Sequence, residues 1–106
     1  MDVNLDEVVV RDNTSANRYE AGVGNHLAVI TYERAPGRIT FIHTMVPPVL
    51  EGHGIAEKMA RSALEEARAA GLAVIPRCPY VAAYIQRHRE YTDLVPADER
   101  SRYLGS

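Results

Sequence analysis

The feature that most constrains the fold of this 106-residue chain is a change of apolar spacing near its middle. Residues 38–46 are rich in Ile, Thr and Phe, which favours a strand. After two prolines and a glycine-rich turn, the apolar residues of 54–70 recur every three or four positions, as in an amphipathic helix. The short apolar segment 72–75 follows. This order predicts a strand, a crossover helix and a second strand, parallel to the first and connected in the right-handed sense.

The period of each element predicts which side chains face the core. Six apolar residues form the inner face predicted for helix 54–70: Ile55, Met59, Ala60, Ala63, Leu64 and Ala67. Strict alternation in strand 38–46 places one set of side chains on one face, namely Ile39, Phe41, His43 and Met45. The opposite face then carries Thr40, Ile42, Thr44 and Val46.

The remaining elements follow from local patterns. Strands are predicted over residues 7–11, 18–23 and 26–34, with residues 26–34 and 38–46 joined as an antiparallel hairpin. A second helix is predicted over 79–88, with Cys78 near its N-cap and Pro79 at its first position. A docked coil and a short helix near Asp98 complete the chain. We therefore expect one α/β (α+β) domain over residues 1–106, with a mixed, mostly antiparallel sheet and two main helices.

Composition excludes several classes of protein. With 46% hydrophobic and 25% charged residues, the chain is typical of a globular protein. A net charge of −2 gives no electrostatic basis for binding nucleic acid, and no apolar run approaches the roughly 20 residues that cross a membrane. The acidic segment 1–7 lacks the basic start and apolar stretch of a secretory signal. We therefore expect a cytoplasmic protein that binds neither nucleic acid nor membranes.

Cysteine and histidine positions exclude further chemistry. The single cysteine, Cys78, rules out an internal disulfide and a cysteine-pair zinc site. The four histidines have no spacing that builds a metal coordination shell, so no metal is expected. A hydrolase dyad of Cys78 and His88 fails on distance, because ten residues of helix rise about 15 Å.

The glycine-rich turn between the strand and the helix is the most informative motif. Its sequence is Glu51-Gly52-His53-Gly54-Ile55-Ala56. The first backbone amides of a helix lack helical partners and the helix dipole favours negative charge, so the turn suits a phosphate or pyrophosphate. A nucleotide-hydrolase loop requires Lys and Ser or Thr after its last glycine, and a dinucleotide-binding loop requires a third glycine where Glu57 stands. Neither reading fits, although two glycines here also suit a purely structural turn.

This turn is similar to the coenzyme A pyrophosphate loop of the GNAT acyltransferase superfamily, Arg/Gln-x-x-Gly-x-Gly/Ala, with Gly54 and Ala56 in the required places and Glu51 replacing the usual Arg or Gln. The runs 43–47 and 76–81, Tyr84-Ile85-x-x-His88 and the run 90–95 resemble signatures of small, minimal GNAT-like proteins. The similarity covers roughly residues 8–95. It implies a shortened GNAT fold in which strands 38–46 and 72–75 splay apart to admit the acetyl thioester.

The resemblance also implies site residues. Acetyl-CoA, the cosubstrate, would contact Thr44, Val46, the six residues of the turn (Glu51, Gly52, His53, Gly54, Ile55 and Ala56) and Tyr84. Members of the similar family are proposed to use a cysteine at the position of Cys78. This thiol would donate a proton to the departing CoA thiolate or accept the acetyl group transiently, and its structural alternative is a small buried residue. His43 is a candidate base for the amine, with a buried core histidine as the alternative.

These observations predict an N-acetyltransferase that transfers acetyl from acetyl-CoA to a primary amine. The acceptor stays open between a small molecule and a protein lysine. The alternative is a CoA-binding or protein-interaction module with little turnover, because so short a chain has little material for an acceptor pocket. A homodimer would supply the missing wall of such a pocket.

Overall fold

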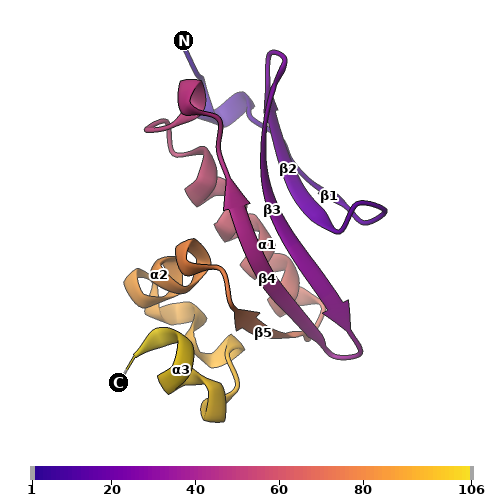
Figure 1. Ribbon diagram of the computed structural model, residues 1–106, viewed down its shortest axis with the longest axis vertical. Coiled ribbons are helices and arrows are strands. Elements are labelled where there is room, and N and C mark those ends of the chain that lie inside the picture. The colour runs from indigo at the N-terminus through magenta and orange to yellow at the C-terminus, as the bar shows by residue number, and fades with distance from the viewer. Residues whose placement is uncertain (1, 106) are drawn as a thin grey trace.

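The computed structural model describes residues 2–105, which form a five-stranded sheet with strand order β1-β2-β3-β4-β5 (Figure 1). The strands are β1 (Val10–Asn13), β2 (Arg18–Val23), β3 (His26–Ala35), β4 (Arg38–Met45) and β5 (Ala73–Pro76). The α-helices are α1 (Ile55–Ala69), α2 (Pro79–Arg87) and α3 (Arg100–Leu104). Four short 3-10 helices connect them: η1 (Leu5–Glu7), η2 (Pro48–Leu50), η3 (Arg89–Leu94) and η4 (Ala97–Glu99).

The strand pairing confirms the predicted mixed sheet. Strands β1 to β4 pair antiparallel, whereas β4 and β5 are parallel neighbours on either side of the α1 crossover. Pairing of β4 with β5 ends at Phe41 and Pro76, and the backbone N–H of Cys78 donates to the carbonyl oxygen of Phe41 at 2.8 Å. Beyond this point β4 continues to Met45, whereas the segment that follows β5 turns away into α2. The two strands therefore diverge, as the resemblance implied.

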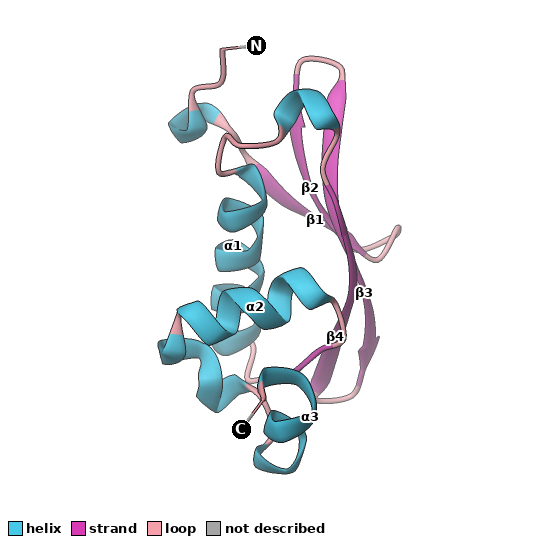
Figure 2. Cartoon of the chain, turned by 60° about the vertical axis from the view of Figure 1, so that its left-hand side comes forward, coloured by secondary structure: helices cyan, strands magenta, loops and turns pink. Residues whose placement is uncertain are grey.

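All three helices gather on one side of the sheet (Figure 2). The six apolar residues predicted for the inner face of α1 are the helix's buried residues, and each is at most 2% exposed. Against them pack the inward side chains of the sheet, led by Ile30, Ile39 and Phe41. Burying such apolar surface stabilises the fold by roughly 25 cal/mol per Å². The core therefore lies in a single layer between sheet and helices, and the opposite face of the sheet carries no helix.

The first strand begins later than predicted. Residues 7–11 were expected to be extended, but β1 spans Val10–Asn13 and η1 precedes it. The polar end of β1 is held in the sheet by side-chain partners, because Asn13 donates to Glu20 at 2.9 Å and the Tyr32 hydroxyl donates to Asp12 at 2.5 Å. A run of valines favoured an earlier strand, whereas these long-range hydrogen bonds set its actual position.

A β-bulge overturns the predicted faces of β4. Tyr32 pairs with Phe41, but its neighbour Thr31 pairs with His43, so Ile42 is an extra residue on β4. The alternation of side chains shifts by one position there. Ile39 and Phe41 face the core, while His43 and Met45 are exposed and Thr44 turns inward. The prediction that His43 shares a face with Phe41 was therefore wrong.

Segments on either side of the core are fastened to α1. The Lys58 ammonium donates to the carbonyl oxygen of Leu5 at 2.6 Å, which holds the N-terminal segment. Arg68 forms two hydrogen bonds to the Asp93 carboxylate and a third to the Glu90 carbonyl, which hold η3. In the described part of the chain, no helix has the length and apolar character to cross a membrane.

Candidate functional site

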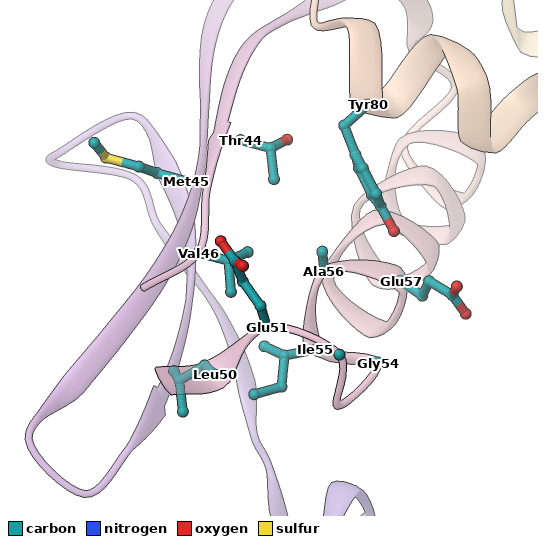
Figure 3. A pocket seen from close by; sticks show the side chains of 11 residues that line it. Thr44, Met45, Val46, Leu50, Glu51, Gly54, Ile55, Ala56, Glu57 and Tyr80 are labelled. Carbon is teal, nitrogen blue, oxygen red and sulfur yellow. The ribbon is translucent and has the colours of Figure 1, made fainter. Parts of the chain in front are cut away.

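A cavity of about 540 Å³ opens where β4 departs from β5 (Figure 3). It lies within the volume range of small-ligand sites. The lining comes from the end of β4, the glycine-rich turn, the first turn of α1 and the first turn of α2: Thr44, Met45, Val46, Leu50, Glu51, Gly52, Gly54, Ile55, Ala56, Glu57 and Tyr80. The gap between the diverging strands β4 and β5 therefore opens into a cavity that is bounded by the N-terminus of α1.

The glycine-rich turn reaches α1 through two left-handed residues. Gly52 has φ +80° and Gly54, the N-cap of α1, has φ +81°. Such angles favour glycine, because a Cβ crowds the backbone there. Within the described residues, no side chain caps this helix, so the first-turn amides of Ile55, Ala56 and Glu57 have no capping partner. Amides of this kind, at the positive end of a helix dipole, are donors for a phosphate or pyrophosphate.

Two carboxylates stand near these donors. Figure 3 shows the Glu51 carboxylate lying beside Val46 at the cavity, whereas the side chain of Glu57 points away from Val46 and Glu51. Both residues are exposed. Glu51 occupies the position where Arg or Gln is usual, and its negative charge opposes a bound anion. Between these two kinds of group, only the amides of α1 would attract an anion such as a pyrophosphate.

A hydrogen bond joins β4 to the start of α2 beside the cavity. The Thr44 hydroxyl lies 3.1 Å from the Cys78 sulfur, at a distance that allows either atom to donate. Cys78 is the N-cap of α2 and is only 1% exposed, whereas Thr44 lines the cavity. Cys78 itself is not among the lining residues. The Cys78 thiol therefore lies behind the cavity wall, and the Thr44 side chain separates it from the cavity.

Tyr80 is a cavity residue that sequence reasoning missed. It lies on the first turn of α2, and Figure 3 shows its hydroxyl directed toward Ala56 and Glu57 at the start of α1. Burial, and to a smaller degree the Glu57 carboxylate, raises the pKa of this phenol above its usual value. The hydroxyl therefore keeps its proton at neutral pH. Its position two residues after Cys78, at the start of a predicted helix, was the available signal.

Besides Cys78, three predicted site residues do not line the cavity. The bulge directs exposed His43 to the face of the sheet opposite Thr44 and Cys78. His53 is half-buried in the turn but does not line the cavity. Tyr84 lines a neighbouring cavity instead, where its ring stacks on His88 with 4.1 Å between centroids. Over residues 2–105, no group of three His, Cys, Asp or Glu side chains is placed to hold a metal ion.

Diverging parallel strands, a glycine-rich turn and an uncapped helix N-terminus at the same cavity define a small acyltransferase-type fold of the GNAT class. A sequence profile described as GCN5-related N-acetyl-transferase matches residues 18–94, which is most of the chain and includes both walls of the cavity. The chain belongs to this family. A search of curated proteins found no match. Family membership indicates acetyltransferase activity, and the family typically uses acetyl-CoA.

Proposed function

We propose that this protein transfers the acetyl group of acetyl-CoA to a primary amine, with the cofactor bound in the cavity between β4 and α2. The observation that carries the proposal is the uncapped N-terminus of α1, reached through Gly52 and Gly54, at the wall of a cavity of about 540 Å³. This turn fits a pyrophosphate because the first amides of α1 have no capping partner, and because Gly52 and Gly54 have no side chain that would block its approach. Acetyl-CoA supplies an activated thioester when bound.

Side chains at the cavity would position the thioester and donate a proton to the departing thiolate. Thr44 and Val46 line the cavity beyond the last β4–β5 pair, where a thioester would lie along β4. Cys78, held by Thr44, is our candidate proton donor to the departing thiolate. The Tyr80 hydroxyl, which lines the cavity and keeps its proton at neutral pH, is a second candidate donor. Much of the remaining acceleration would come from positioning.

His43 is our candidate base for the amine, acting from the opposite face of β4. Consecutive residues of a strand point to opposite faces, so His43 and Thr44 flank the same stretch of backbone. An amine that approaches across the open face of the sheet would meet His43, while the cofactor approaches from the helical side. The amine would then reach the thioester carbon through the gap that opens where β4 diverges from β5.

A specific observation favours a second candidate function, which is CoA binding with little turnover. Cys78 is 1% exposed and does not line the cavity. A protein that only bound CoA would need neither an accessible thiol nor a base. Turnover with a panel of amines distinguishes the two functions.

The test is binding of acetyl-CoA to the wild type and to two charge variants on α1. Ala56→Glu adds a carboxylate at the first turn, where it suits the helix dipole but repels a pyrophosphate. Ala69→Glu adds the same charge at the exposed end of the helix and serves as control. At about 100 times its dissociation constant, acetyl-CoA should stabilise the wild type by roughly 2.7 kcal/mol. For a domain of this size that corresponds to a rise in melting temperature of about 10 °C.

We expect the control to keep this rise and Ala56→Glu to lose it while remaining folded without ligand. A panel of small amines and lysine-containing peptides then measures acetyl transfer by the wild type. No thermal shift and no calorimetric signal with millimolar acetyl-CoA would refute the proposed function. Tight binding without transfer to any amine would favour the binding module.

A further inference from the structure

A separate cavity, of about 600 Å³, lies where α3 packs beside α2 (Figures 1 and 2). This C-terminal cavity is lined by Gln86, Arg89, Thr92, Arg100, Leu104 and Gly105. It shares no lining residue with the cavity beside β4 or with the cavity that Tyr84 lines. Its volume is within the range of small-ligand sites. The C-terminal cavity is therefore distinct from the proposed site of acetyl transfer.

Short-range spacing brings two pairs of side chains to the C-terminal cavity. Arg89 and Thr92 are three residues apart in η3, and side chains at this spacing eclipse one another in a 3-10 helix. Arg100 and Leu104 are four residues apart in α3, which places them on one face of that helix. Gln86 adds a side chain from α2. Two arginines from different helices therefore line the same space.

Hydrogen bonds within the fold hold this lining in place. The Gln86 side-chain amide donates to the Leu104 carbonyl oxygen at 2.8 Å, which ties α3 to α2. The Arg100 Nε donates to the carbonyl oxygen of buried Val95, also at 2.8 Å. Within residues 2–105, the Nη groups of Arg100 have no hydrogen-bond or ion-pair partner. Arg100 is therefore oriented by the protein and keeps N–H donors for a ligand.

The positive charge of the C-terminal cavity is not neutralised by its lining. Arg89 is exposed and, in the part of the chain that the structure describes, forms no hydrogen bond or ion pair. None of the described lining residues is acidic, because the carboxylates close in sequence lie outside the lining: Glu90, Asp93, Asp98 and Glu99. Asp93 pairs with Arg68 at 2.9 Å. Glu99 pairs with Arg102 at 3.6 Å. The other two are exposed, so solvent and salt screen their charge.

We propose that the C-terminal cavity binds a small phosphomonoester, with its phosphate between the Arg89 and Arg100 guanidiniums. The parallel N–H groups of a guanidinium match two phosphate oxygens, and two guanidiniums suit a dianion better than a carboxylate with a single charge. The Thr92 hydroxyl can donate a further hydrogen bond. A phosphate fills only part of the cavity, and half-buried Leu104 offers an apolar contact to the rest of the ligand. This binding does not depend on the proposed acetyl transfer.

The test measures the affinity of phenyl phosphate by calorimetry. The principal variant is Arg89→Gln, because Arg89 makes no contact of its own in the described fold, and Arg100→Gln is the second variant. The control is Arg34→Gln, which removes the same charge from an exposed position near the end of β3. We expect each cavity variant to bind phenyl phosphate at least about tenfold more weakly than the wild type, since a charge-assisted contact is lost. The control should bind as the wild type does.

Two further comparisons fix the place and the chemistry of binding. Ala56→Glu repels an anion from the glycine-rich turn and should leave the affinity for phenyl phosphate unchanged. Phenylacetate carries the same ring with a carboxylate and should bind more weakly than phenyl phosphate. Amide NMR shifts on titration with phenyl phosphate should be largest in η3 and α3.

Four results would overturn the inference. They are no calorimetric signal from the wild type with millimolar phenyl phosphate, an unchanged affinity in Arg89→Gln, a loss of affinity in Ala56→Glu, and equal affinity for phenylacetate. The first two would show that the cavity does not bind an anion through its arginines. The third would place binding at the glycine-rich turn, and the fourth would exclude selection of a phosphate. None of them bears on acetyl-CoA binding, so the proposed function is tested separately.

Discussion

Replacing Gly54 by alanine should lower the melting temperature of the protein by about 4 to 8 °C. Gly54 has φ +81°, and a left-handed conformation costs an L-residue roughly 1–2 kcal/mol. Alanine also restricts the unfolded chain, which offsets about 0.4–1 kcal/mol. The net loss is about 1 kcal/mol, which in a domain of about this size lowers the melting temperature by the stated amount. The new Cβ would lie 3.2 Å from Leu5 Cδ2, the flexible end of a side chain, so this contact adds little.

Two matched variants separate backbone strain from contacts. Gly52→Ala has the same positive φ and no atom within 4 Å of the new Cβ, so it should lose nearly as much stability as Gly54→Ala. Gly22→Ala lies in β2 at an ordinary backbone conformation, with its nearest contacts at 3.9 Å, and should melt at or above the wild-type temperature. The measurement is thermal unfolding followed by far-UV circular dichroism without ligand. Wild-type melting of Gly52→Ala and Gly54→Ala, or an equal loss in Gly22→Ala, would refute the reasoning.

Two further predictions concern Glu20 and Cys78. Hydrogen bonds from Asn13, then Arg18 and Arg11, hold the pKa of buried Glu20 at about 2, below its usual 4.5. The stability that the Glu20 charge contributes is therefore complete above pH 4.5 and is lost as the pH falls toward 2. The melting temperature of Glu20→Gln should vary less than that of the wild type across this range. Equal changes of melting temperature with pH in the two proteins would contradict a stabilising role for these hydrogen bonds. Cys78→Ala should lower acetyl transfer by about 10² to 10⁴-fold at unchanged acetyl-CoA affinity, and wild-type turnover in this variant would leave positioning to carry the reaction.

The helix and sheet pairing could be predicted because local periodicity and global packing agree. The buried face of α1 follows directly from apolar spacing, and the parallel pair β4–β5 follows from the strand, helix, strand order. Cys78 and Pro79 begin α2 where the sequence placed them, because proline suits the first position of a helix. These features depend on residues close together in the chain.

What could not be predicted depends on residues far apart in the chain. The bulge at Ile42 arises from the pairing register of β3 and β4, which alternation within β4 cannot reveal. Glu65 and Glu66 are exposed on α1, and they accept hydrogen bonds from the Tyr91 and Tyr19 hydroxyls at 2.6 Å and 3.1 Å, which apolar spacing alone could not show. A helical wheel shows the direction of a side chain but not the partner that meets it there.

The neighbouring cavity that Tyr84 and His88 line could not be predicted for the same reason. Arg61 has the pattern of an ordinary solvated helix residue, and only the approach of α2 places an aromatic stack opposite it. Similarly, Tyr80 becomes a cavity residue because β4 and β5 diverge beside it. Sequence spacing located the turn that lines the candidate site, whereas the other walls of the cavity depend on the tertiary arrangement.

The extra residue in β4 makes the position of a deletion in this strand matter. Ile42 is unpaired in the register, so deleting it would leave Phe41 and Thr44 facing the core and His43 exposed, in simple alternation. Thr44 would still face Cys78. Among residues 38–46, a one-residue deletion should therefore be tolerated best at Ile42.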